Sequence, residues 1–298
     1  MTCRLAFVHA LSPLHAGTGQ SVGAVELAIA RDRATGFPYL PGSSLKGALR
    51  DRTRDRDRDP RLVRELFGPD TTNASEHAGA LAFGDANLLL FPVRSVAGTF
   101  AWTTSPYLLD RFARDCSEAG APVPPRVQAP ASCERCRVAR DAVIRVGERV
   151  IFEDLDFTYD ADTNVAALAA WLGDRIFAGE DAWKRSLASR LAIVHDDTMT
   201  FLAQHATDIV ARVSIDDATG AAKGTALWHE ENLPTETVLV SLVAAMPNDK
   251  TRSLAPDAMF DELDRIVRPS IQLGGKATVG RGRCRVVFDL AARTGGGK

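Results

Sequence analysis

The chain has 298 residues, of which 45% are hydrophobic and 25% are charged, a composition typical of a globular protein with a substantial core. Its formal net charge is −2, which excludes a global basic field for nucleic acid but leaves room for local clusters of lysine and arginine. No stretch reaches the roughly 20 apolar residues that span a membrane, and the first residues, MTCRLAF, lack the features of a signal peptide. We therefore expect a cytoplasmic protein with no membrane partner.

The amino-terminal residues predict a strand followed by a glycine-containing loop. Residues 4–11 form a short apolar run, and residues 19–38 contain three glycines and short mixed runs that suit a structured loop or hairpin.

A helix is expected to begin abruptly within FPYLPGSSLKGALR, residues 37–50. Ser43 or Ser44 is the expected N-cap. Lys46 would stand at the positive end of the helix dipole, where a bound phosphate would offset its charge. For this stretch alone a solvated lysine is the simpler explanation, and the glycine-to-lysine spacing of a nucleotide-triphosphate loop is absent.

The middle of the chain alternates short strands and helices. The first expected elements are a solvated helix end at 50–59 and two strands within 81–93, around a turn at Gly84 and Asp85. A helix at 105–118 and an exposed proline-rich insertion at about 120–140 follow. The next expected elements are helices within 164–194, with Trp171 and Trp183 in the core, and a helix at 197–207.

The last third contains the clearest hairpin signal. Apolar alternation in IVARVSI, a break at DDATG and a return through TALWHEE predict a long β-hairpin at about 209–232. Its apolar residues could pack on the body, or the hairpin could reach outward with Arg212, Lys223 and Trp228. A buried strand at 236–246 and a helix at 257–267 follow. This irregular order favours an α+β fold with an antiparallel sheet over a doubly wound parallel sheet.

Near the carboxyl end, GGKATVGRGRCR (residues 274–285) interleaves glycines with Lys276, Arg281 and Arg283. Glycine lets a backbone approach a ligand closely and the cations can neutralise phosphate, so contact with a polyanion is favoured over a flexible loop with incidental arginines. The glycine spacing excludes the dinucleotide-binding fingerprint.

The chain has five cysteines, an odd number that fits reduced thiols. Only Cys133 and Cys136, in SCERC, are spaced like metal ligands. A structural zinc site needs four ligands, so Cys116 or a histidine would have to complete this one, and the pair alone does not establish zinc.

Candidate groups for acid–base or metal chemistry lie in or near expected loops. Cleavage of RNA by its own 2′-hydroxyl needs a base, an acid or metal at the leaving oxygen, and a strand held in line. The residues that could supply these functions are His15, Glu26, Asp85, Glu230 and Glu231. Each of them, taken alone, could equally cap a turn or face water.

Four segments taken together resemble the RAMP superfamily of CRISPR proteins: residues 15–50, LAFGDANLLLFP, GTALWHEENLP and IQLGGKATVGRGRCRV. In this order they are most similar to the repeated backbone subunit of the type III-B, or Cmr, effector complex. The resemblance covers most of the chain and implies a single RAMP domain over residues 1–298. Its palm would be a ferredoxin-like, RNA-recognition-type antiparallel sheet with finger insertions, and the hairpin at about 209–232 would be a protruding thumb.

The resemblance also implies partners and an activity. Copies of the subunit would stack along a guide crRNA as a filament with other Cmr subunits, and would cleave complementary single-stranded target RNA at regular intervals with a divalent metal, expected to be Mg²⁺. Guide phosphates would be held by Ser43, Ser44, Lys46, Lys276, Arg281 and Arg283, and the cleavage site would contain His15, Glu26, Asp85, Glu230 and Glu231. No metal ligands are assigned.

One departure from the family leaves catalysis open. Glu26 stands where the family usually has aspartate, and its extra methylene matters because a displacement of ~1 Å can cost about a hundredfold in rate. A non-catalytic crRNA-binding scaffold is therefore an alternative. A guide-processing endonuclease that uses His15 as general base is a third interpretation, although such enzymes act as single copies and need no outward hairpin. The sequence does not decide whether Glu230 or Glu231 faces RNA.

Overall fold

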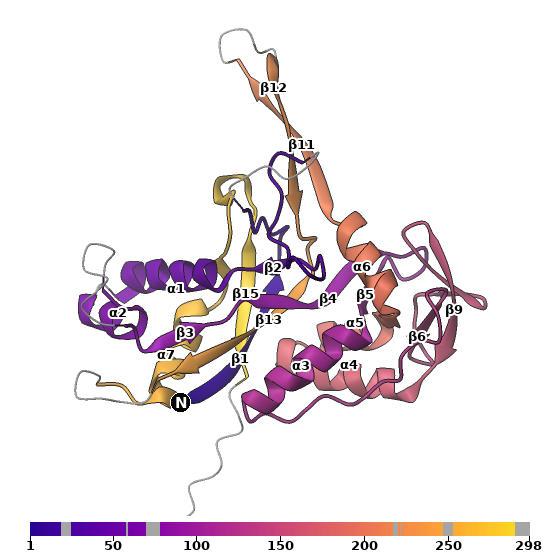
Figure 1. Cartoon of the computed structure of the whole chain (residues 1–298), viewed down its shortest axis with the longest axis horizontal. Helices are drawn as coiled ribbons and strands as arrows, with labels where there is room; N and C mark the ends of the chain where they lie inside the picture. The colour runs from indigo at the N-terminus through magenta and orange to yellow at the C-terminus, as the bar shows by residue number, and fades with distance from the viewer. Residues whose placement is uncertain are drawn as a thin grey trace, which may run out of the picture.

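The computed structural model describes residues 1–18, 25–57, 59–69, 78–216, 220, 222–246 and 253–289, with the backbone alone at 57 and 222–226. Within these residues the chain forms a 13-stranded sheet, layered with helices, and a two-stranded hairpin that rises from one side (Figure 1).

The large sheet is mostly antiparallel. Its strands run in the order β14 (Ile271–Gln272), β15 (Arg283–Phe288), β1 (Thr2–Ala10), β13 (Val238–Ala245), β4 (Ala86–Arg94), β5 (Phe100–Thr104), β10 (Leu191–Val194), β6 (Arg135–Val138), β9 (Leu155–Ala161), β8 (Arg149–Phe152) and β7 (Arg145–Val146). In addition, β2 (Tyr39–Leu40) pairs with β4, and β3 (Leu81–Phe83) pairs with β13. Among the pairings between these described strands, β5 with β10 and β6 with β9 are parallel. The predicted α+β class with an antiparallel sheet is confirmed.

Helices cover both faces of the sheet. The core cluster on one face includes residues of α1 (Gly42–Asp57), α2 (Pro60–Phe67), α6 (Asp196–His205) and α7 (Pro256–Val267). The cluster on the other face includes residues of α3 (Pro106–Glu118), α4 (Thr163–Ile176) and α5 (Asp181–Arg190). A short 3-10 helix, η2 (Ala277–Val279), lies in the glycine-rich loop.

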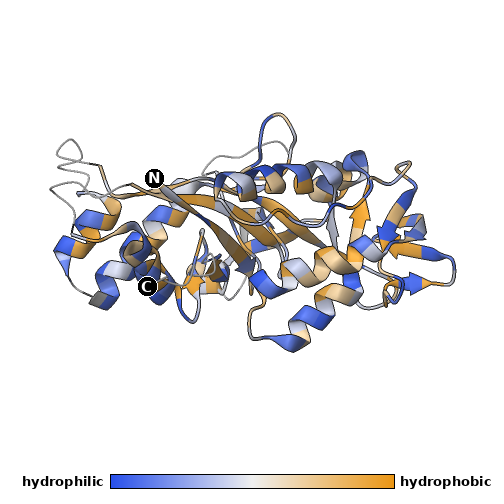
Figure 2. Ribbon diagram, turned by 90° about the horizontal axis from the view of Figure 1, so that it is seen from below, coloured by the Kyte–Doolittle hydropathy of each residue, from blue (hydrophilic) through white to orange (hydrophobic). Residues whose placement is uncertain are grey.

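Strand β1 lies between the two core clusters. Because both of its faces are buried, residues 4–11 form a continuous apolar run. Successive side chains of a strand point to opposite faces. Leu5 and Phe7 therefore enter the cluster with α3 and α4, while Ala6 and Val8 enter the cluster with α1 and α7. Figure 2 shows the hydrophobic residues concentrated on the strands, with polar residues on the outer sides of the helices.

The predicted hairpin is confirmed as β11 (Asp208–Ile215) paired with β12 (Ala222–Asn232). It extends away from the sheet and helices (Figure 1). One of its faces exposes apolar side chains, namely Ile209, Val213, Ile215 and Leu227. The hairpin therefore reaches outward and does not pack along its length on the body. The expected break at 216–220 and Lys223 fall largely outside the described residues and side chains.

Two local predictions are wrong. Helix α1 begins at Gly42, so Ser43 and Ser44 lie inside its first turn and are not N-caps. Residues 191–194, expected to be helical, form strand β10, because α5 ends at Arg190 and the next four residues are buried between β5 and β6.

The helices expected at 105–118, 197–207 and 257–267 correspond to α3, α6 and α7. Trp171 and Trp183 are partly buried against the core cluster with α4. None of the helices in the described part of the chain has both the length and the apolarity that crossing a membrane requires.

Candidate functional site

The outer edge of β12, on the side away from β11, collects the candidate residues. Alternate residues of a strand direct their backbone groups to the same side. His229 and Glu231 use this edge to bond residue Leu27, through Leu27 N to His229 O at 3.1 Å and Glu231 N to Leu27 O at 3.0 Å. Farther along, Leu233 and Leu14 exchange two hydrogen bonds of 2.9 Å. The segments that contain His15 and Glu26 are thereby bound to one strand edge.

His15 is buried, and its ring is held in one tautomer. Nδ1 lies 2.8 Å from the carbonyl oxygen of Glu231. Because a carbonyl only accepts, Nδ1 must be the donor, and the neutral ring therefore carries its lone pair on Nε2. A ring nitrogen of this kind is suited to accept a proton from a substrate.

Glycines surround this ring. A Cβ added at Gly17 would lie 2.5 Å from His15 Nε2, so any side chain at residue 17 would collide with the nitrogen that carries the lone pair. Gly274 has a φ of +70° and approaches the His15 carbonyl oxygen, and Gly275 N donates to that same oxygen at 2.9 Å. The glycine-rich loop is therefore shaped to fit against His15.

Glu26 is the exposed carboxylate of this edge. Its Oε2 accepts the backbone N–H of His229 at 2.8 Å and lies 3.5 Å from the His229 ring. The hydrogen bond from the His229 backbone holds the pKa of Glu26 below its ordinary value, so the group is charged at neutral pH. The strand atoms that Glu26 and His15 contact are two residues apart, about 7 Å along β12.

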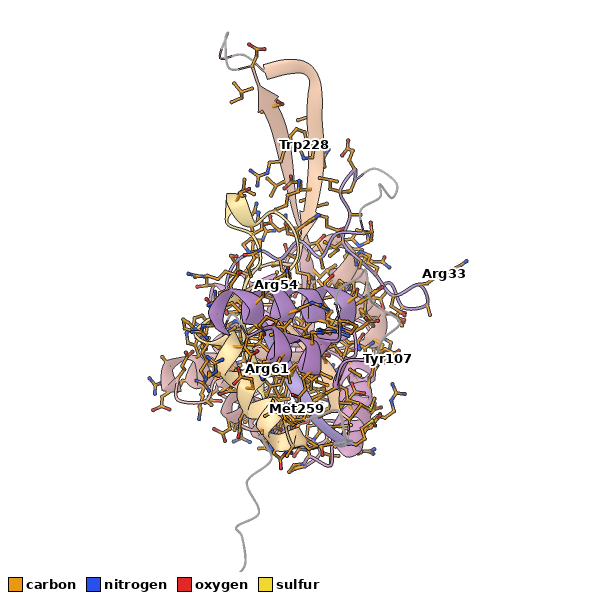
Figure 3. The ribbon with its side chains drawn as sticks, turned by 90° about the vertical axis from the view of Figure 1, so that its left-hand side faces the viewer. Arg33, Arg54, Arg61, Tyr107, Trp228 and Met259 are labelled. Carbon is orange, nitrogen blue, oxygen red and sulfur yellow. The ribbon has the colours of Figure 1, made fainter. Side chains whose placement is uncertain are left out.

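Glu230 is buried among donors from three segments. Lys276 Nζ lies 3.1 Å and Trp228 Nε1 lies 3.0 Å from its Oε1, and Arg212 Nε lies 3.3 Å from its Oε2. Burial raises the pKa of Glu230, but the hydrogen bonds from Trp228 and Lys276 and the charges of Lys276 and Arg212 outweigh burial, and the net shift is downward. Figure 3 shows Trp228 on the hairpin above the body.

Glu231 has a structural role. Its Oε1 accepts from Arg31 Nη2 at 2.5 Å and from Thr207 Oγ1 at 2.9 Å, and its Oε2 accepts from Ile29 N at 3.2 Å. Arg31 also donates to the carbonyl oxygens of Gly36 and Ala203, each at 2.9 Å. Glu231 thus ties the base of the hairpin to α6 and to the loop before β2. Arg31 lies in a mixed run without a motif, so no sequence signal indicates this role.

Asp85 lies apart from these residues, at the start of α1. Its Oδ1 accepts the backbone N–H of Gly42 at 2.8 Å. An oxygen that binds a first-turn N–H acts as a helix cap. The cap expected from Ser43 or Ser44 is therefore supplied by a residue 43 positions later in the chain.

A groove of about 590 Å³ lies between α1 and the glycine-rich loop. Its walls include Gly17, Ser44, Gly47, Arg52, Gly274 and Gly275, together with the acidic Asp51 and Asp55. The Nε atom of Arg52 is buried and has no hydrogen-bond partner among the described residues. The same holds for Nε of Arg281, which lies outside the residues that line the groove. Arg52 was read only as part of a solvated charged run.

The remaining predicted phosphate-binding residues take different positions. Lys46 is partly exposed on α1, and Ser43 and Arg283 are exposed. Lys276, in a left-handed conformation at φ 65°, directs its ammonium to Glu230.

The predicted cleavage residues do not form a ready-made metal site. The carboxylate oxygens of Glu230 and Glu231 already accept hydrogen bonds from cationic or neutral donors, and Glu26 is the exposed acid next to His15. Within the described residues, three potential ligand atoms converge only at Cys133, His195 and Asp197, on α6 and the segment before β6.

Comparisons with known proteins agree with this arrangement. The family model described as the RAMP superfamily matches residues 7–285. The CRISPR system Cmr endoribonuclease Cmr4 of Pyrococcus furiosus is 34% identical over 298 residues, which is 99% of each chain. The chain belongs to the RAMP superfamily, as a member of the Cmr4 family.

Solved structures of Cmr4 share this fold. The crystal structure of oligomeric Cmr4 from Pyrococcus furiosus matches with a TM-score of 0.75 and 27% identity, over 97% of this chain and 98% of that one. A chain in the cryo-EM structure of the type III-B Cmr-beta complex bound to cognate target RNA matches with a TM-score of 0.72 over 97% of both chains. That chain is 21% identical, a similarity that shows the fold alone.

Asp85 gives a first test of these assignments. Asp85→Asn keeps an oxygen for the Gly42 N–H and should leave the free energy of unfolding nearly unchanged, whereas Asp85→Ala should lower it by about 1 kcal/mol. Urea unfolding of both variants measures the difference. An equal loss in both would mean that the charge of Asp85, and not the cap, is what matters.

Glu230 gives a test by pH. Its pKa in the folded protein lies below the ordinary value of 4.5, so its contribution to stability is fully present above the unfolded pKa and is lost as pH falls through the folded pKa. We expect Glu230→Gln to cost about 2 kcal/mol at neutral pH, and the gap from wild type to close below about pH 4.5. Glu148→Gln, at an exposed position, is the control. A gap that stays constant down to acid pH would contradict the charged role of Glu230.

Proposed function

We propose that this chain is the repeated backbone subunit of a type III-B CRISPR effector, and that it binds guide crRNA and cleaves complementary target RNA. The observation that carries the proposal is the placement of His15 and Glu26 on one edge of β12, beside a groove that Arg52 lines, in a member of the Cmr4 family. Membership of that family also favours a backbone subunit over the guide-processing interpretation.

The central sheet supports a ferredoxin-like palm. Strands β1, β4, β13 and β15, with α1 after β1 and α7 after β13, follow the β-α-β-β-α-β order. In the sheet they lie in the order β15-β1-β13-β4, all antiparallel, and α1 and α7 contribute to the same core cluster. The opposite face is covered by α3 and α4, so the palm does not present an open sheet to RNA.

In this proposal the β11–β12 hairpin is the thumb. Its outward direction and its exposed apolar residues suit contact with a partner surface or with unstacked bases. Because Glu26 and His15 are attached to β12, a thumb that interrupts the guide–target duplex would bring each interruption next to the site of cutting. That arrangement would give cuts at regular intervals along a filament of copies, with other Cmr subunits as further partners. A crystallised oligomer of the Pyrococcus furiosus relative supports self-association.

The groove beside α1 is the proposed guide site. Its glycines allow a phosphate backbone to approach closely. Arg52, Arg281 and Lys46 would neutralise phosphates, while the exposed Ser43 and Arg283 would make contacts at its margin. Lys276 contributes indirectly, since its charge is shared with Glu230.

In the proposed reaction, His15 Nε2 accepts the proton of a 2′-hydroxyl in the target RNA. The 2′-oxygen then bonds to the adjacent phosphorus, the bond from phosphorus to the 5′-oxygen breaks, and the leaving oxygen takes up a proton from water. Before the transfer, the charged Glu26 would accept the hydrogen bond of the attacking hydroxyl and orient it, and the hydroxyl hydrogen would then turn to His15 Nε2. Gly17 keeps Nε2 accessible, because even a methyl group there would cover it.

A divalent metal, with Mg²⁺ as the expected ion, is a separate part of the proposal. The described acids and His15 supply no preformed three-ligand group, so the site by itself does not fit a resident metal. Glu26 is the available carboxylate, and phosphate oxygens of the bound RNA would have to supply the other ligands. We assign no step of the reaction to a metal.

The alternative is a crRNA-binding scaffold without cleavage. It is favoured by one observation, namely that Glu26 bonds the His229 backbone and could serve only to hold its own loop on β12.

Substitutions at Gly47 test the guide site. A Cβ at Gly47 meets nothing within 4 Å, so the fold does not require glycine there. Gly47→Ala should stabilise α1 by about 0.5–1 kcal/mol. Gly47→Leu should keep the fold but fill the groove and weaken binding of single-stranded RNA at least tenfold. Ala170→Leu, at an exposed position of α4, is the size-matched control.

Fluorescence anisotropy at several salt concentrations, together with thermal unfolding, measures these effects. Wild-type affinity should fall steeply as salt rises, because phosphate contacts release counterions. If Gly47→Leu bound RNA as tightly as Ala170→Leu, the groove would not be the guide site.

Substitutions at Glu26 separate enzyme from scaffold. In assembled complexes with a matched target, Glu26→Gln should reduce the cleavage rate by a hundredfold or more, because it removes the charge that orients the 2′-hydroxyl, and it should leave guide binding intact. Glu26→Asp should retain or raise activity. Repeating the wild-type reaction with a chelator in place of Mg²⁺ measures the metal dependence.

Equal rates for wild type and Glu26→Gln would remove Glu26 from the reaction. A protein that cuts only after the change to aspartate would be a scaffold.

A further inference from the structure

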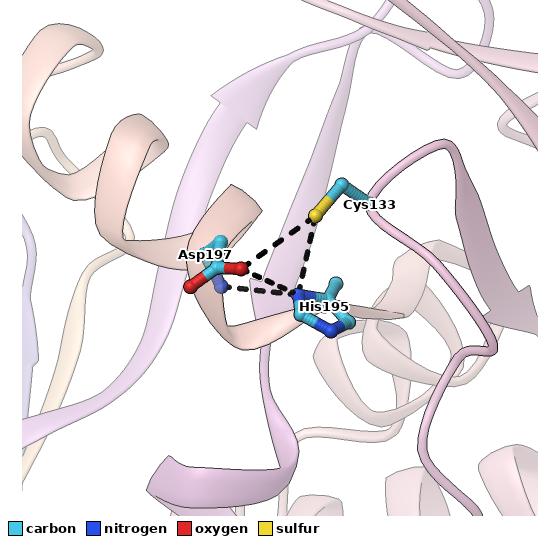
Figure 4. Close-up of side chains that lie close together, drawn as sticks. All are labelled: Cys133, His195 and Asp197. Carbon is cyan, nitrogen blue, oxygen red and sulfur yellow. Dashed lines mark hydrogen bonds and ion pairs between the residues drawn. The ribbon is translucent and has the colours of Figure 1, made fainter.

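We propose that Cys133, His195 and Asp197 form a binding site for a divalent transition metal of the zinc class. The three side chains converge outside the RNA-cleavage site, where α6 begins beside the segment that enters β6 (Figure 4).

The spacing of the three ligand atoms fits one tetrahedral ion. Cys133 Sγ lies 3.4 Å from His195 Nδ1 and 3.8 Å from Asp197 Oδ2, and Nδ1 lies 3.5 Å from Oδ2. With bonds of about 2.3 Å to sulfur and about 2.0 Å to nitrogen or oxygen, the edges of a tetrahedral zinc site are about 3.3–3.5 Å. The sulfur–nitrogen and nitrogen–oxygen edges of the triangle have this length, and the sulfur–oxygen edge of 3.8 Å is slightly longer. A small shift of the exposed Asp197 carboxylate would complete one face of such a site, and the fourth position is left for water or a further ligand.

Sheet pairing brings these residues together. Strands β6 and β10 are antiparallel, with Cys136 opposite Val194. The residues just before β6 therefore lie beside the residues just after β10, and Cys133 meets His195 although 62 positions separate them. Asp197 follows in the first turn of α6.

The local backbone is fixed in the required position. The buried Thr198 donates through Oγ1 to the carbonyl oxygen of Cys133 at 3.1 Å, which ties the cysteine to α6. Asp196, between the histidine and the aspartate, accepts the backbone N–H of Tyr107 at 2.9 Å and anchors the same turn to α3. A site on a preorganised backbone loses less entropy when it binds a ligand.

The orientation of His195 distinguishes a metal site from a catalytic triad. The backbone N–H of Asp197 donates to Nδ1 at 3.3 Å, so Nδ1 carries the lone pair of the ring, and a metal bound there would take the place of this hydrogen bond, which caps α6. Cys133 and Asp197 both approach this same nitrogen. In a Cys-His-Asp triad the acid and the nucleophile would contact opposite ring nitrogens.

Of the C-x-x-C pair considered in the sequence, only Cys133 takes part in this arrangement. Cys136 is 0% exposed within β6, and burial raises its pKa to about 12, so it does not join Cys133 as a ligand. Cys116 is also buried, and burial likewise raises its pKa to about 12. All five cysteines lie in the described part of the chain, and of these Cys133 alone is exposed. A thiolate with an imidazole and a carboxylate suits zinc better than magnesium, which prefers oxygen ligands.

A metal here would act on the base of the hairpin. It would fasten the end of the proline-rich insertion to α6, and α6 ends three residues before β11 begins. The role we assign to the ion is therefore to stiffen the support of the hairpin.

The test uses the full-length protein, purified under reducing conditions and treated with a chelator. After removal of the chelator, Zn²⁺ and Co²⁺ are titrated separately. We expect one ion per chain by elemental analysis, a thiolate-to-cobalt charge-transfer band with Co²⁺, and a higher Tm with Zn²⁺. Cys133→Ser should abolish the band. Cys133→Ser, His195→Gln and Asp197→Asn should each weaken binding at least about tenfold, a loss that outer-shell partners alone can cause.

Glu134→Gln, next to Cys133, and His205→Gln, at the far end of α6, change exposed residues outside the site; they serve as matched controls and should bind as wild type does. The absence of stoichiometric binding would overturn the proposal. So would a charge-transfer band that survives Cys133→Ser, or one that a folded Cys136→Ala protein loses.

Discussion

The arrangement of this molecule depends on one constraint: two adjacent carboxylates, Glu230 and Glu231, are buried at the base of the hairpin. Taking an ionised group out of water is costly unless cations and hydrogen-bond donors surround it. Glu230 meets this requirement through Lys276, Trp228 and Arg212, which come from the glycine-rich loop and from both strands of the hairpin. Its neighbour Glu231 meets it through Arg31 and Thr207.

These two adjacent acids therefore join the hairpin to segments that are distant in sequence. The same strand then positions the candidate chemistry. The backbone N–H of His229 holds Glu26, and the backbone carbonyl of Glu231 fixes the tautomer of His15. Both groups belong to a regular strand, so their positions do not depend on the rotamer of a long side chain. A site supported by a strand is held more precisely than one carried on loops. Glu230 and Glu231, which the sequence placed among the candidate cleavage residues, are both buried and support the hairpin through their hydrogen bonds.

The sequence could predict whatever depends on local periodicity. The hairpin followed from apolar alternation in residues 209–215, and the antiparallel α+β class followed from the order of elements. The resemblance to the RAMP superfamily located the segments that matter. Features that depend on a residue far away in the sequence could not be predicted. Asp85 caps α1 from 43 positions away, and the sequence therefore predicted the nearby Ser43 or Ser44 as the cap instead. Strand β10 is only four residues long and follows a helix directly, which left no periodic signal.

The same limit applies to the side-chain clusters. Lys276 looked like a phosphate ligand because Glu230 was not visible beside it. From its spacing, Cys133 looked like half of a C-x-x-C pair. The pairing of β6 with β10 brings His195 to Cys133 and buries Cys136, and the spacing of residues in the sequence does not reveal this pairing. Arg52 and Arg281 were recognised as unpaired only after their burial was known.

In the proposed reaction, His15 and Glu26 act as one unit on the edge of β12. The measurement that tests this most directly is a double-mutant cycle on the single-turnover rate of target cleavage in assembled complexes, with His15→Gln, Glu26→Gln and both changes together. If the two groups act on the same 2′-hydroxyl, the double variant should be little slower than the slower single variant. Rate losses that multiply independently, or no loss in either single variant, would contradict the claim.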